Sequence, residues 1–377
     1  MRFADINGNQ EAVEAVRGMV DSGRIPHALL LSGPPGIGKM LLARALVSYI
    51  NCENPIDGDS CGVCPSCRRI EAGNNPDIHY IYPIYKVKSA HLERSSDYAK
   101  EWTQMLHESP YMDMTYWMKL MNGANSQPRI YVDDAAEITS IASLSSYSDN
   151  YKIFLIWLPE RLQPDAANKI LKILEEPQSD TLFIAVSDEP NAILPTIYSR
   201  MRRIEMKRPS AQEIEKFLLE CGTSPSYAPA LASLSEGSLL KATQLIGAES
   251  ETQEFGEIFR GIMRESYARK VAVLKRRSDE LAALGREKSI RLLDYFGRMT
   301  RENFISNLCL PPLNVMTPEE SGFSSKFAPF INVANVEYIL SAIDDAKRDI
   351  SRNGNSKLIW FDFMILLMIS LRKKPQT

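Results

Sequence analysis

The chain has 377 residues, and its 44% apolar and 24% charged side chains are ordinary for a soluble globular protein of two or three domains. A formal charge of -3 and a pI near 6.0 exclude a protein that coats nucleic acid by bulk charge alone. No apolar run approaches the roughly 18 residues of a membrane-spanning helix, and the first residues lack the basic and apolar regions of a signal peptide. We therefore expect no membrane association and a cytoplasmic location.

A phosphate-binding loop, GPPGIGKM, follows a short apolar strand predicted at 28–31 and precedes a helix predicted at 40–50. The glycines and lysine of the pattern G-x-x-x-x-G-K-[ST] are present as Gly33, Gly36, Gly38 and Lys39. In this context the loop amides, the helix N-terminus and the lysine suit a phosphate group. Met40 stands where Ser or Thr normally reaches Mg²⁺, and a thioether cannot replace that hard oxygen ligand. Whether the loop still holds ATP or ADP stays open.

The strand that normally supplies an Mg²⁺ carboxylate ends without one. Residues 153–156 read as a buried strand, and Trp157 and Leu158 follow where a phosphate-loop ATPase has Asp-Glu. Glu160 lies further on, in a predicted turn. A later strand ends at Ser187, which is placed to contact a γ-phosphate, although a serine at a strand end also commonly forms a turn. With the change at the end of the phosphate loop, two independent Mg²⁺ positions are lost, which indicates that hydrolysis was abandoned.

Four cysteines cluster directly after the loop helix. Cys52, Cys61, Cys64 and Cys67 are separated by eight, two and two residues. This spacing favours a tetrahedral, structural Zn²⁺ site, because four thiolates close the coordination shell and disulfides are disfavoured in a reducing compartment. Cys221 and Cys309 stand alone in the sequence, and we expect both to be small buried apolar residues.

An arginine follows the short helix predicted at 193–198. Ser199 and Arg200 come at the end of that helix, just before the next predicted strand. A guanidinium projecting from this point can stabilise phosphate charge on a neighbouring subunit, an effect of roughly 10³–10⁵ in rate for known arginine fingers. The alternative is a surface arginine in an ordinary ion pair.

Several segments together resemble one family. FADINGNQEAVEAV, GRIPHALLLSGPPGIGK, the cysteine cluster, NPDIHYI, NKILKILEEP and LPTIYSRM are similar to bacterial DNA polymerase III clamp-loader subunits over about residues 1–245. The resemblance implies an α/β AAA+ P-loop core, in which a parallel sheet has flanking helices and an inserted zinc module. It also implies a helical lid and an all-α C-terminal collar domain after that core.

Departures from the motor pattern distinguish the members of this family. ATPase motor subunits (gamma/tau) would have Ser or Thr at Met40, Asp-Glu at Trp157 and Leu158, and Arg at Leu240. All of these are absent from this sequence. The chain therefore resembles the non-hydrolysing member, delta-prime, and we expect it to have no intrinsic ATPase activity.

The family's S-R-C motif is present as Ser199, Arg200 and Met201, so the arginine is retained and the cysteine is lost. The resemblance implies that Arg200 acts in trans on the ATP of a neighbouring subunit. It further implies a hetero-pentamer with gamma/tau and delta subunits, which loads a sliding clamp on primed DNA.

We expect the AAA+ core at 1–208, with the zinc module at about 52–67 and an extra insertion at about 86–128. The lid is expected at 209–248 and the helical oligomerisation domain at 249–377. The insertion either packs on the core or binds a partner, and the sequence does not distinguish these roles.

Two other functions remain open on the sequence. A self-sufficient ATPase motor would need Glu160 or Asp188 to have taken over as the Mg²⁺ carboxylate. A zinc-ribbon nucleic-acid binder is disfavoured by the acidic balance and by the lack of interleaved basic and aromatic residues around the cysteines. The many Lys and Arg residues at 264–301 form either a solvated helix face or a face toward DNA or a partner.

Overall fold

The computed structural model describes residues 1–87, 92–122, 127–144, 146, 151–177, 180–247, 249–308 and 313–373. The chain divides into two compact units. The first unit comprises Met1–Glu220 and Ser235–Thr243, and the second comprises Cys221–Leu234 and Gln244–Thr377. The three-part division expected from the sequence stays a prediction.

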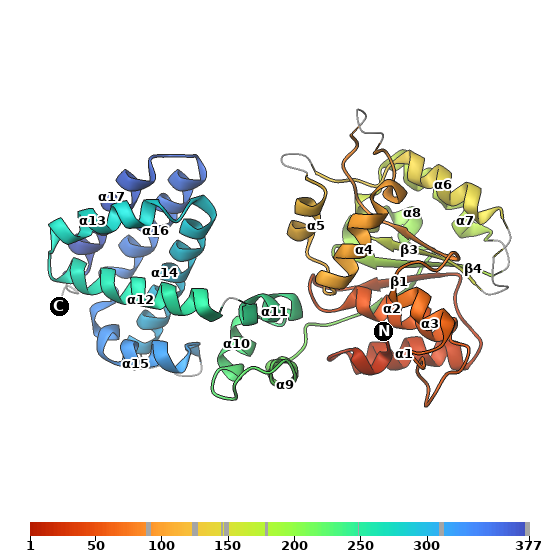
Figure 1. Cartoon of the computed structure of the whole chain (residues 1–377), viewed down its shortest axis with the longest axis horizontal. Coiled ribbons are helices and arrows are strands. Elements are labelled where there is room, and N and C mark those ends of the chain that lie inside the picture. The colour runs from red at the N-terminus through yellow and green to blue at the C-terminus, as the bar shows by residue number, and fades with distance from the viewer. Residues whose placement is uncertain are drawn as a thin grey trace. The chain divides into compact units, whose positions relative to one another are not determined.

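Among the described residues of the first unit, a five-stranded parallel sheet forms the centre (Figure 1). Its strands are β1 (Ala28–Ser32), β2 (Ile78–Ile81), β3 (Lys152–Trp157), β4 (Thr181–Ser187) and β5 (Arg202–Glu205). Their order is β2-β3-β4-β1-β5, and every pairing is parallel. All residues of β1, β3 and β4 are buried, as expected of strands covered on both faces. The strands predicted at 28–31 and 153–156 are confirmed.

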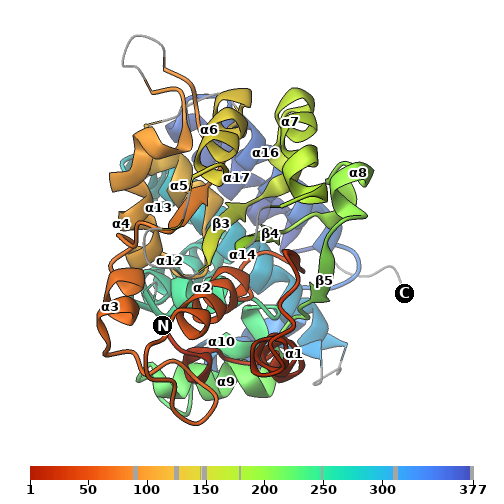
Figure 2. The same cartoon turned by 90° about the vertical axis from the view of Figure 1, so that its right-hand side faces the viewer.

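Helices cover both faces of this sheet (Figures 1 and 2). The helices of the first unit are α1 (Gln10–Asp21), α2 (Lys39–Ile50), α3 (Pro65–Glu71), α4 (Ala99–Glu108), α5 (Met114–Leu120), α6 (Val132–Ala142), α7 (Pro164–Glu175), α8 (Pro195–Tyr198) and α9 (Ala211–Glu220), and not all of them lie on the sheet. On one face, α6, α7 and α8 pack against alternate strand residues such as Phe154 and Phe183. On the other face, α2 contacts β1, β3 and β4, and α1 contacts β5. Alternate strand residues therefore point into two separate apolar layers.

The start of α9 shows how local sequence sets a helix boundary. The backbone N–H of Ser210 donates to Glu213 Oε2 over 2.7 Å, and the backbone N–H of Glu213 donates to Ser210 Oγ over 3.3 Å. This reciprocal pair is a capping box, which satisfies amide groups that have no partner inside the helix.

The described part of the insertion at 86–128 packs on the core of the first unit. Residues 88–91 and 123–126 lie outside the described residues. The side chains of Trp102, Met105 and Leu106 in α4 are buried, and so is Trp117 in α5. The described part of the insertion therefore packs on the core, and a partner-binding role stays open.

The described part of the second unit is helical. Its helices are α10 (Ala228–Leu234), α12 (Glu249–Tyr267), α13 (Val271–Ala282), α14 (Arg286–Asn307), α15 (Pro318–Phe327), α16 (Val336–Ser351) and α17 (Ser356–Ser370), and α11 (Leu239–Gly247) runs from the first unit into it. Leu293 and Phe296 of α14 and Trp360 of α17 are buried in one apolar core. No helix in the described ranges is both long and apolar enough to cross a membrane.

Many basic side chains between 264 and 301 are held in ion pairs. Arg277 pairs with Glu265 and Glu280, Lys288 with Glu254, Arg291 with Glu251, Arg298 with Glu320, and Arg301 with Glu302. These five of the eleven basic residues in the segment have acidic partners, which favours the solvated helix face over a face toward DNA or a partner for this part of it.

Candidate functional site

The phosphate loop joins β1, in the interior of the sheet, to the first turn of α2. Gly36 has a φ of +74°, in the left-handed region that a residue with a Cβ rarely adopts. A Cβ on Gly36 would also lie 2.5 Å from Ser238 Oγ and 2.8 Å from Leu240 Cβ. The backbone N–H of Leu240 donates to the Gly36 carbonyl over 3.0 Å. Leu240, at the start of α11, therefore lies directly over the loop, and only glycine fits at position 36.

The loop lysine is buried and fully bonded. Lys39 is 4% exposed, and its ammonium donates to the carbonyl of Gly33 over 2.7 Å and to the carbonyl of Pro34. It also pairs with Asp188 Oδ1 at 2.8 Å. Burial lowers the pKa of Lys39, and the neighbouring Asp188 carboxylate opposes that shift. Because an ammonium has three protons, this arrangement leaves none for a phosphate unless an existing bond breaks.

The carboxyl end of β3 is filled by aromatic packing. Trp157 is 1% exposed, and its ring centroid lies 5.5 Å from that of Trp102 in α4. Trp102 in turn stacks on Tyr82 at 4.0 Å and meets Trp117 edge to face at 5.4 Å. Leu158, the next residue after β3, is 4% exposed. At the place where a phosphate-loop ATPase has its metal carboxylate, side chains of the insertion form an apolar cluster with Trp157.

The nearby acidic residues are held by other groups. Glu160 lies in the turn η4 (Pro159–Arg161), and its Oε1 accepts the backbone N–H groups of Asp188 at 3.0 Å and Glu189 at 3.1 Å. Burial raises the pKa of Glu160, and these amide bonds oppose that shift. Ser187, the last residue of β4, is fully buried. Met40 is also buried, in the first turn of α2.

The four predicted cysteine ligands converge. The Sγ atoms of Cys52, Cys61, Cys64 and Cys67 all lie within 4.8 Å of one another. The N–H groups of Cys61, Cys64 and Cys67 donate to the sulfurs of Cys52, Cys61 and Cys64 at 3.2, 3.3 and 3.4 Å, respectively. Backbone N–H bonds from Val63 and Cys64 lower the pKa of the Cys61 thiol to about 6. Amide donors of this kind stabilise thiolates, so the cluster can hold a metal ion.

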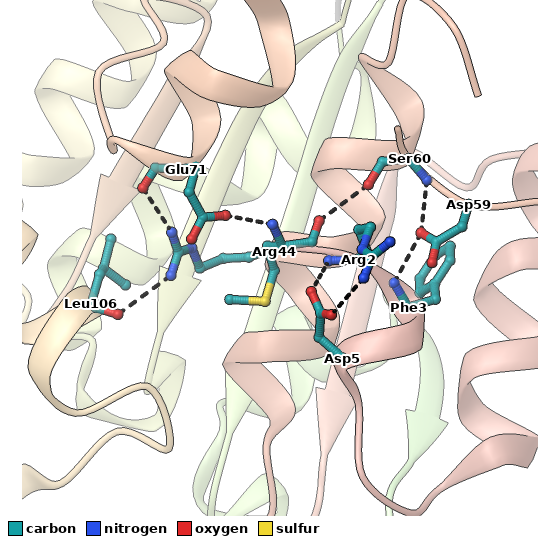
Figure 3. Close-up of polar contacts among 9 residues, drawn as sticks. Arg2, Phe3, Asp5, Arg44, Asp59, Ser60, Glu71 and Leu106 are labelled. Atoms are coloured by element: carbon teal, nitrogen blue, oxygen red, sulfur yellow. Dashed lines mark hydrogen bonds and ion pairs between the residues drawn. The ribbon is translucent and has the colours of Figure 1, made fainter. Parts of the chain in front are cut away.

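A buried arginine connects this cysteine segment to the loop helix (Figure 3). Arg44 in α2 is 2% exposed and donates to the carbonyls of Glu71 in α3 at 3.2 Å and Leu106 in α4 at 3.4 Å. On the far side of the same segment, Asp59 accepts the backbone N–H of Phe3 at 2.9 Å. The cysteine segment, the insertion and the chain's first residues are thus tied to the helix that begins at the phosphate loop.

Arg200 lies just after α8, with an exposed guanidinium. It donates to the carbonyl of Thr196 over 2.7 Å and forms an ion pair with Glu175 at the end of α7. Ser199 is exposed and donates its hydroxyl to the same carbonyl at 3.3 Å. Met201 is buried against the core, in contrast to its two predecessors.

The predicted residues therefore gather in three places: the loop with the ends of β3 and β4, the cysteine cluster, and the end of α8. Sequence reasoning missed Arg44, although a lone charge in an apolar helix was a usable signal. The expectation of a buried Cys221 is wrong, because this residue lies in the turn that follows α9 and is exposed. Cys309 lies outside the described residues.

A parallel sheet in the order β2-β3-β4-β1-β5, with a phosphate loop after β1 and helices on both faces, defines a P-loop core of the AAA+ type. The sequence profile of the family described as "DNA polymerase III, delta subunit" matches residues 8–210, more than half of the chain. The chain belongs to this family. The match confirms the resemblance to DNA polymerase III clamp-loader subunits.

Several curated relatives carry related names. The chain is 27% identical to DNA polymerase III subunit delta' of Bacillus subtilis over 63% of this chain and 58% of that protein. It is 27% identical to subunit tau of Escherichia coli, over 64% and 32%, and 30% identical to subunit gamma of Buchnera aphidicola, over 57% and 48%. The chain thus spans less than two thirds of the length of these relatives. A solved gamma subunit-related protein of Thermotoga maritima matches 96% of this chain and all of that one, at 14% identity and a TM-score of 0.37.

Proposed function

We propose that the chain is a non-hydrolysing stator subunit of the DNA polymerase III clamp loader. In this role it assembles with gamma/tau ATPase subunits and a delta subunit in a hetero-pentamer. It supplies Arg200 to a neighbour's ATP and so helps that assembly load the sliding clamp on primed DNA. The family match over residues 8–210 supports a place in the clamp loader. The geometry around the phosphate loop and the end of β3 supports a role without ATP hydrolysis.

The observation that carries the non-hydrolysing role is the buried Trp157 at the end of β3. Mg²⁺ needs hard oxygen ligands, and this position presents an indole packed 5.5 Å from Trp102. The other position that normally serves the metal is the buried thioether of Met40. Neither side chain can hold Mg²⁺, and each is only 1% exposed.

The rival motor function needs a substitute carboxylate, and both candidates are engaged. Asp188 pairs with Lys39 at 2.8 Å. Glu160 accepts two backbone N–H groups that fix the exit from β4. Because relatives named gamma and tau also match this chain, the motor function remains the alternative that the ATPase assay must distinguish. Nucleotide bound without hydrolysis would need Lys39 to exchange its carbonyl and carboxylate partners for phosphate oxygens, the contacts that this lysine makes in an active phosphate loop.

We assign the cysteine cluster to a structural zinc ion. A tetrahedral Zn²⁺ with Zn–S bonds of about 2.3 Å brings its four sulfurs to about 3.8 Å from one another, which fits within the 4.8 Å spread of these thiols. Cys52, Cys61, Cys64 and Cys67 would fill all four positions. The ion would therefore stabilise the fold of the segment and leave no position for a substrate.

Arg200 is suited to act on a neighbouring subunit. Its partner in the isolated chain is Glu175, and both side chains are more than a third exposed. Exposed ion pairs of this kind contribute only about 0–1 kcal/mol. Arg200 can therefore leave Glu175 for a triphosphate at small cost. A surface ion pair and an arginine finger are thus compatible states of one side chain.

The division into core (1–208), lid (209–248) and collar (249–377) remains part of the proposal. Leu240 of the expected lid covers Gly36, which supports a lid acting on the loop. In the expected collar, one side of α17 leaves Leu358, Leu366 and Ile369 exposed at 67%, 38% and 54%. Such an apolar face supports packing against neighbouring collar helices.

The test of this function compares Arg200→Ala with Arg202→Ala in the reconstituted assembly. Both residues are exposed arginines, so the two variants remove the same charge within three positions of each other. We expect Arg200→Ala to lower the clamp- and DNA-stimulated ATPase by at least 10³-fold, in line with the roughly 10³–10⁵ of known fingers, and Arg202→Ala to leave it nearly unchanged. Equal turnover of wild type and Arg200→Ala would refute the finger.

A further inference from the structure

Four aromatic side chains contact one another in sequence on α12, α15 and the turn that follows α15. Figure 1 shows where these helices lie in the second unit. The centroids of Phe323 and Phe327 are 5.0 Å apart, those of Phe327 and Phe330 are 5.9 Å apart, and those of Phe330 and Tyr267 are 4.8 Å apart. Phe327 is buried, whereas Phe323 and Phe330 are half-buried and Tyr267 is 41% exposed. We call these four residues the aromatic row.

Cationic side chains lie along this row. The Arg264 guanidinium is 5.8 Å from the centroid of Phe323, and the Arg372 guanidinium is 5.1 Å from that of Tyr267. Arg260, Arg264 and Lys326 line one open groove of about 520 Å³, together with the first two rings of the row. We call these three residues the groove cations. Glu319 lies in the same groove and is its one acidic residue.

The groove cations differ from the other basic residues of this unit. Within the described ranges, none of the three forms an ion pair, whereas Arg277, Lys288, Arg291 and Arg298 each pair with a glutamate. Three cations against the single carboxylate of Glu319 leave the groove with a net positive charge. Three free cations beside half-buried rings are a strongly attractive site for a polyanion that also carries planar groups.

We propose that this groove and the aromatic row bind single-stranded DNA. The groove cations contact backbone phosphates. Arg264 leaves the face of Phe323 for a phosphate, and unpaired bases stack on that freed face and on Tyr267. A duplex would use the cations but not the rings, because its bases are already stacked on one another. An acidic peptide without aromatic residues would likewise leave the aromatic row unused. The choice of DNA follows from the polymerase family to which the chain belongs, and the site does not depend on the stator role.

The test measures binding of a fluorescein-labelled oligothymidylate of about 12 nucleotides, within the usual site size of single-strand binders, to the full chain by fluorescence anisotropy. Arg264→Ala/Lys326→Ala removes two groove cations. Arg348→Ala/Lys357→Ala removes two exposed, ion-paired cations of the same unit and is the control matched for charge. Phe323→Leu keeps an apolar side chain and removes the stacking face.

Two lost phosphate contacts reduce the slope of log K against log salt by about 1.4. Over the tenfold range from 1 M to 0.1 M salt this amounts to about 25-fold, so we expect the groove variant to bind about 25-fold more weakly at 0.1 M salt. The control should bind like wild type, and Phe323→Leu should weaken binding without changing the slope. Equal losses in the groove and control variants would overturn the assignment. Duplex binding as tight as single-strand binding would also overturn it, as would polyglutamate binding with no affinity for the oligothymidylate.

Discussion

Trp102→Ala should destabilise the first unit by about 3 kcal/mol. Removing a buried tryptophan costs about 3–5 kcal/mol through lost burial and the cavity left behind. Trp102 also loses its stack on Tyr82 at 4.0 Å and its edge contact with Trp117, and aromatic pairs contribute about 0.5–1.5 kcal/mol each. Against this, the indole Nε1 of Trp102 is buried with no hydrogen-bond partner in the described structure, so its removal recovers part of that loss.

The assay is urea unfolding followed by far-UV circular dichroism. With a slope of about 3 kcal/mol/M, a loss of 3 kcal/mol lowers the midpoint of the first unit by about 1 M. The second unit contains none of the changed residues and provides an internal reference. Lys100→Ala on the exposed side of α4 is the control, and it should shift stability by less than about 0.5 kcal/mol. A change below 1 kcal/mol for Trp102→Ala would refute the view that the insertion closes the core at the end of β3.

Two further changes test the metal and a buried ion pair. Purified chain should contain about one zinc ion, measured by plasma mass spectrometry. Cys64→Ser should lose this zinc and unfold at a lower temperature, although the serine hydroxyl can still accept the Cys67 N–H and cap α3. Full zinc content in the variant would contradict the site. Glu320→Gln should destabilise the second unit by about 2 kcal/mol at pH 7, because Gln can still cap α15 but loses the charge that pairs with Arg298. Burial raises the pKa of Glu320, but the bonds and charge of Arg298 lower it overall, below its usual value of about 4.3. The stabilisation is therefore present above about pH 4.3 and is lost as the pH falls through the lowered pKa. If chemical denaturation below that pKa still showed a stability difference between wild type and variant, the prediction would be contradicted.

Much of the fold could be predicted from local patterns in the sequence. The strand, loop and helix around Gly33–Lys39 were readable because the loop chemistry and both flanking elements lie within one short segment. The cysteine cluster was readable for the same reason, since ligand spacing is a local property. The capping box at Ser210 and Glu213 is another case in which residues three apart determine the structure.

The remaining features depend on packing between residues far apart in the chain, which local sequence patterns do not predict. The contact between Trp102 and Trp157 joins residues 55 positions apart, and neither alone indicates that the insertion fills the end of β3. The pairing of Lys39 with Asp188 likewise depends on β1 and β4 lying side by side in the sheet. The predicted burial of Cys221 failed because its residue type suggests a core, whereas its place after a helix end exposes it.

The aromatic row shows the same limit in the second unit. Tyr267 and Phe330 are 63 positions apart, yet their ring centroids are 4.8 Å apart. The abundance of Lys and Arg at 264–301 pointed toward this region but not to the relevant side chains. Ion pairs distinguish these side chains. Arg264 forms no ion pair in the described structure, whereas Arg277 and Arg291 are neutralised by glutamates.

The most direct test of the central claim is ATP hydrolysis by the purified chain with Mg²⁺. Met40, the buried Trp157 and the fully bonded Lys39 predict no turnover above the level of Lys39→Ala, which serves as the matched control. The same preparation should restore clamp-stimulated turnover to an assembly that lacks this subunit, which shows that the protein is competent. Sustained turnover by the isolated chain that Lys39→Ala abolishes would contradict the account, and the chain would then be a motor subunit.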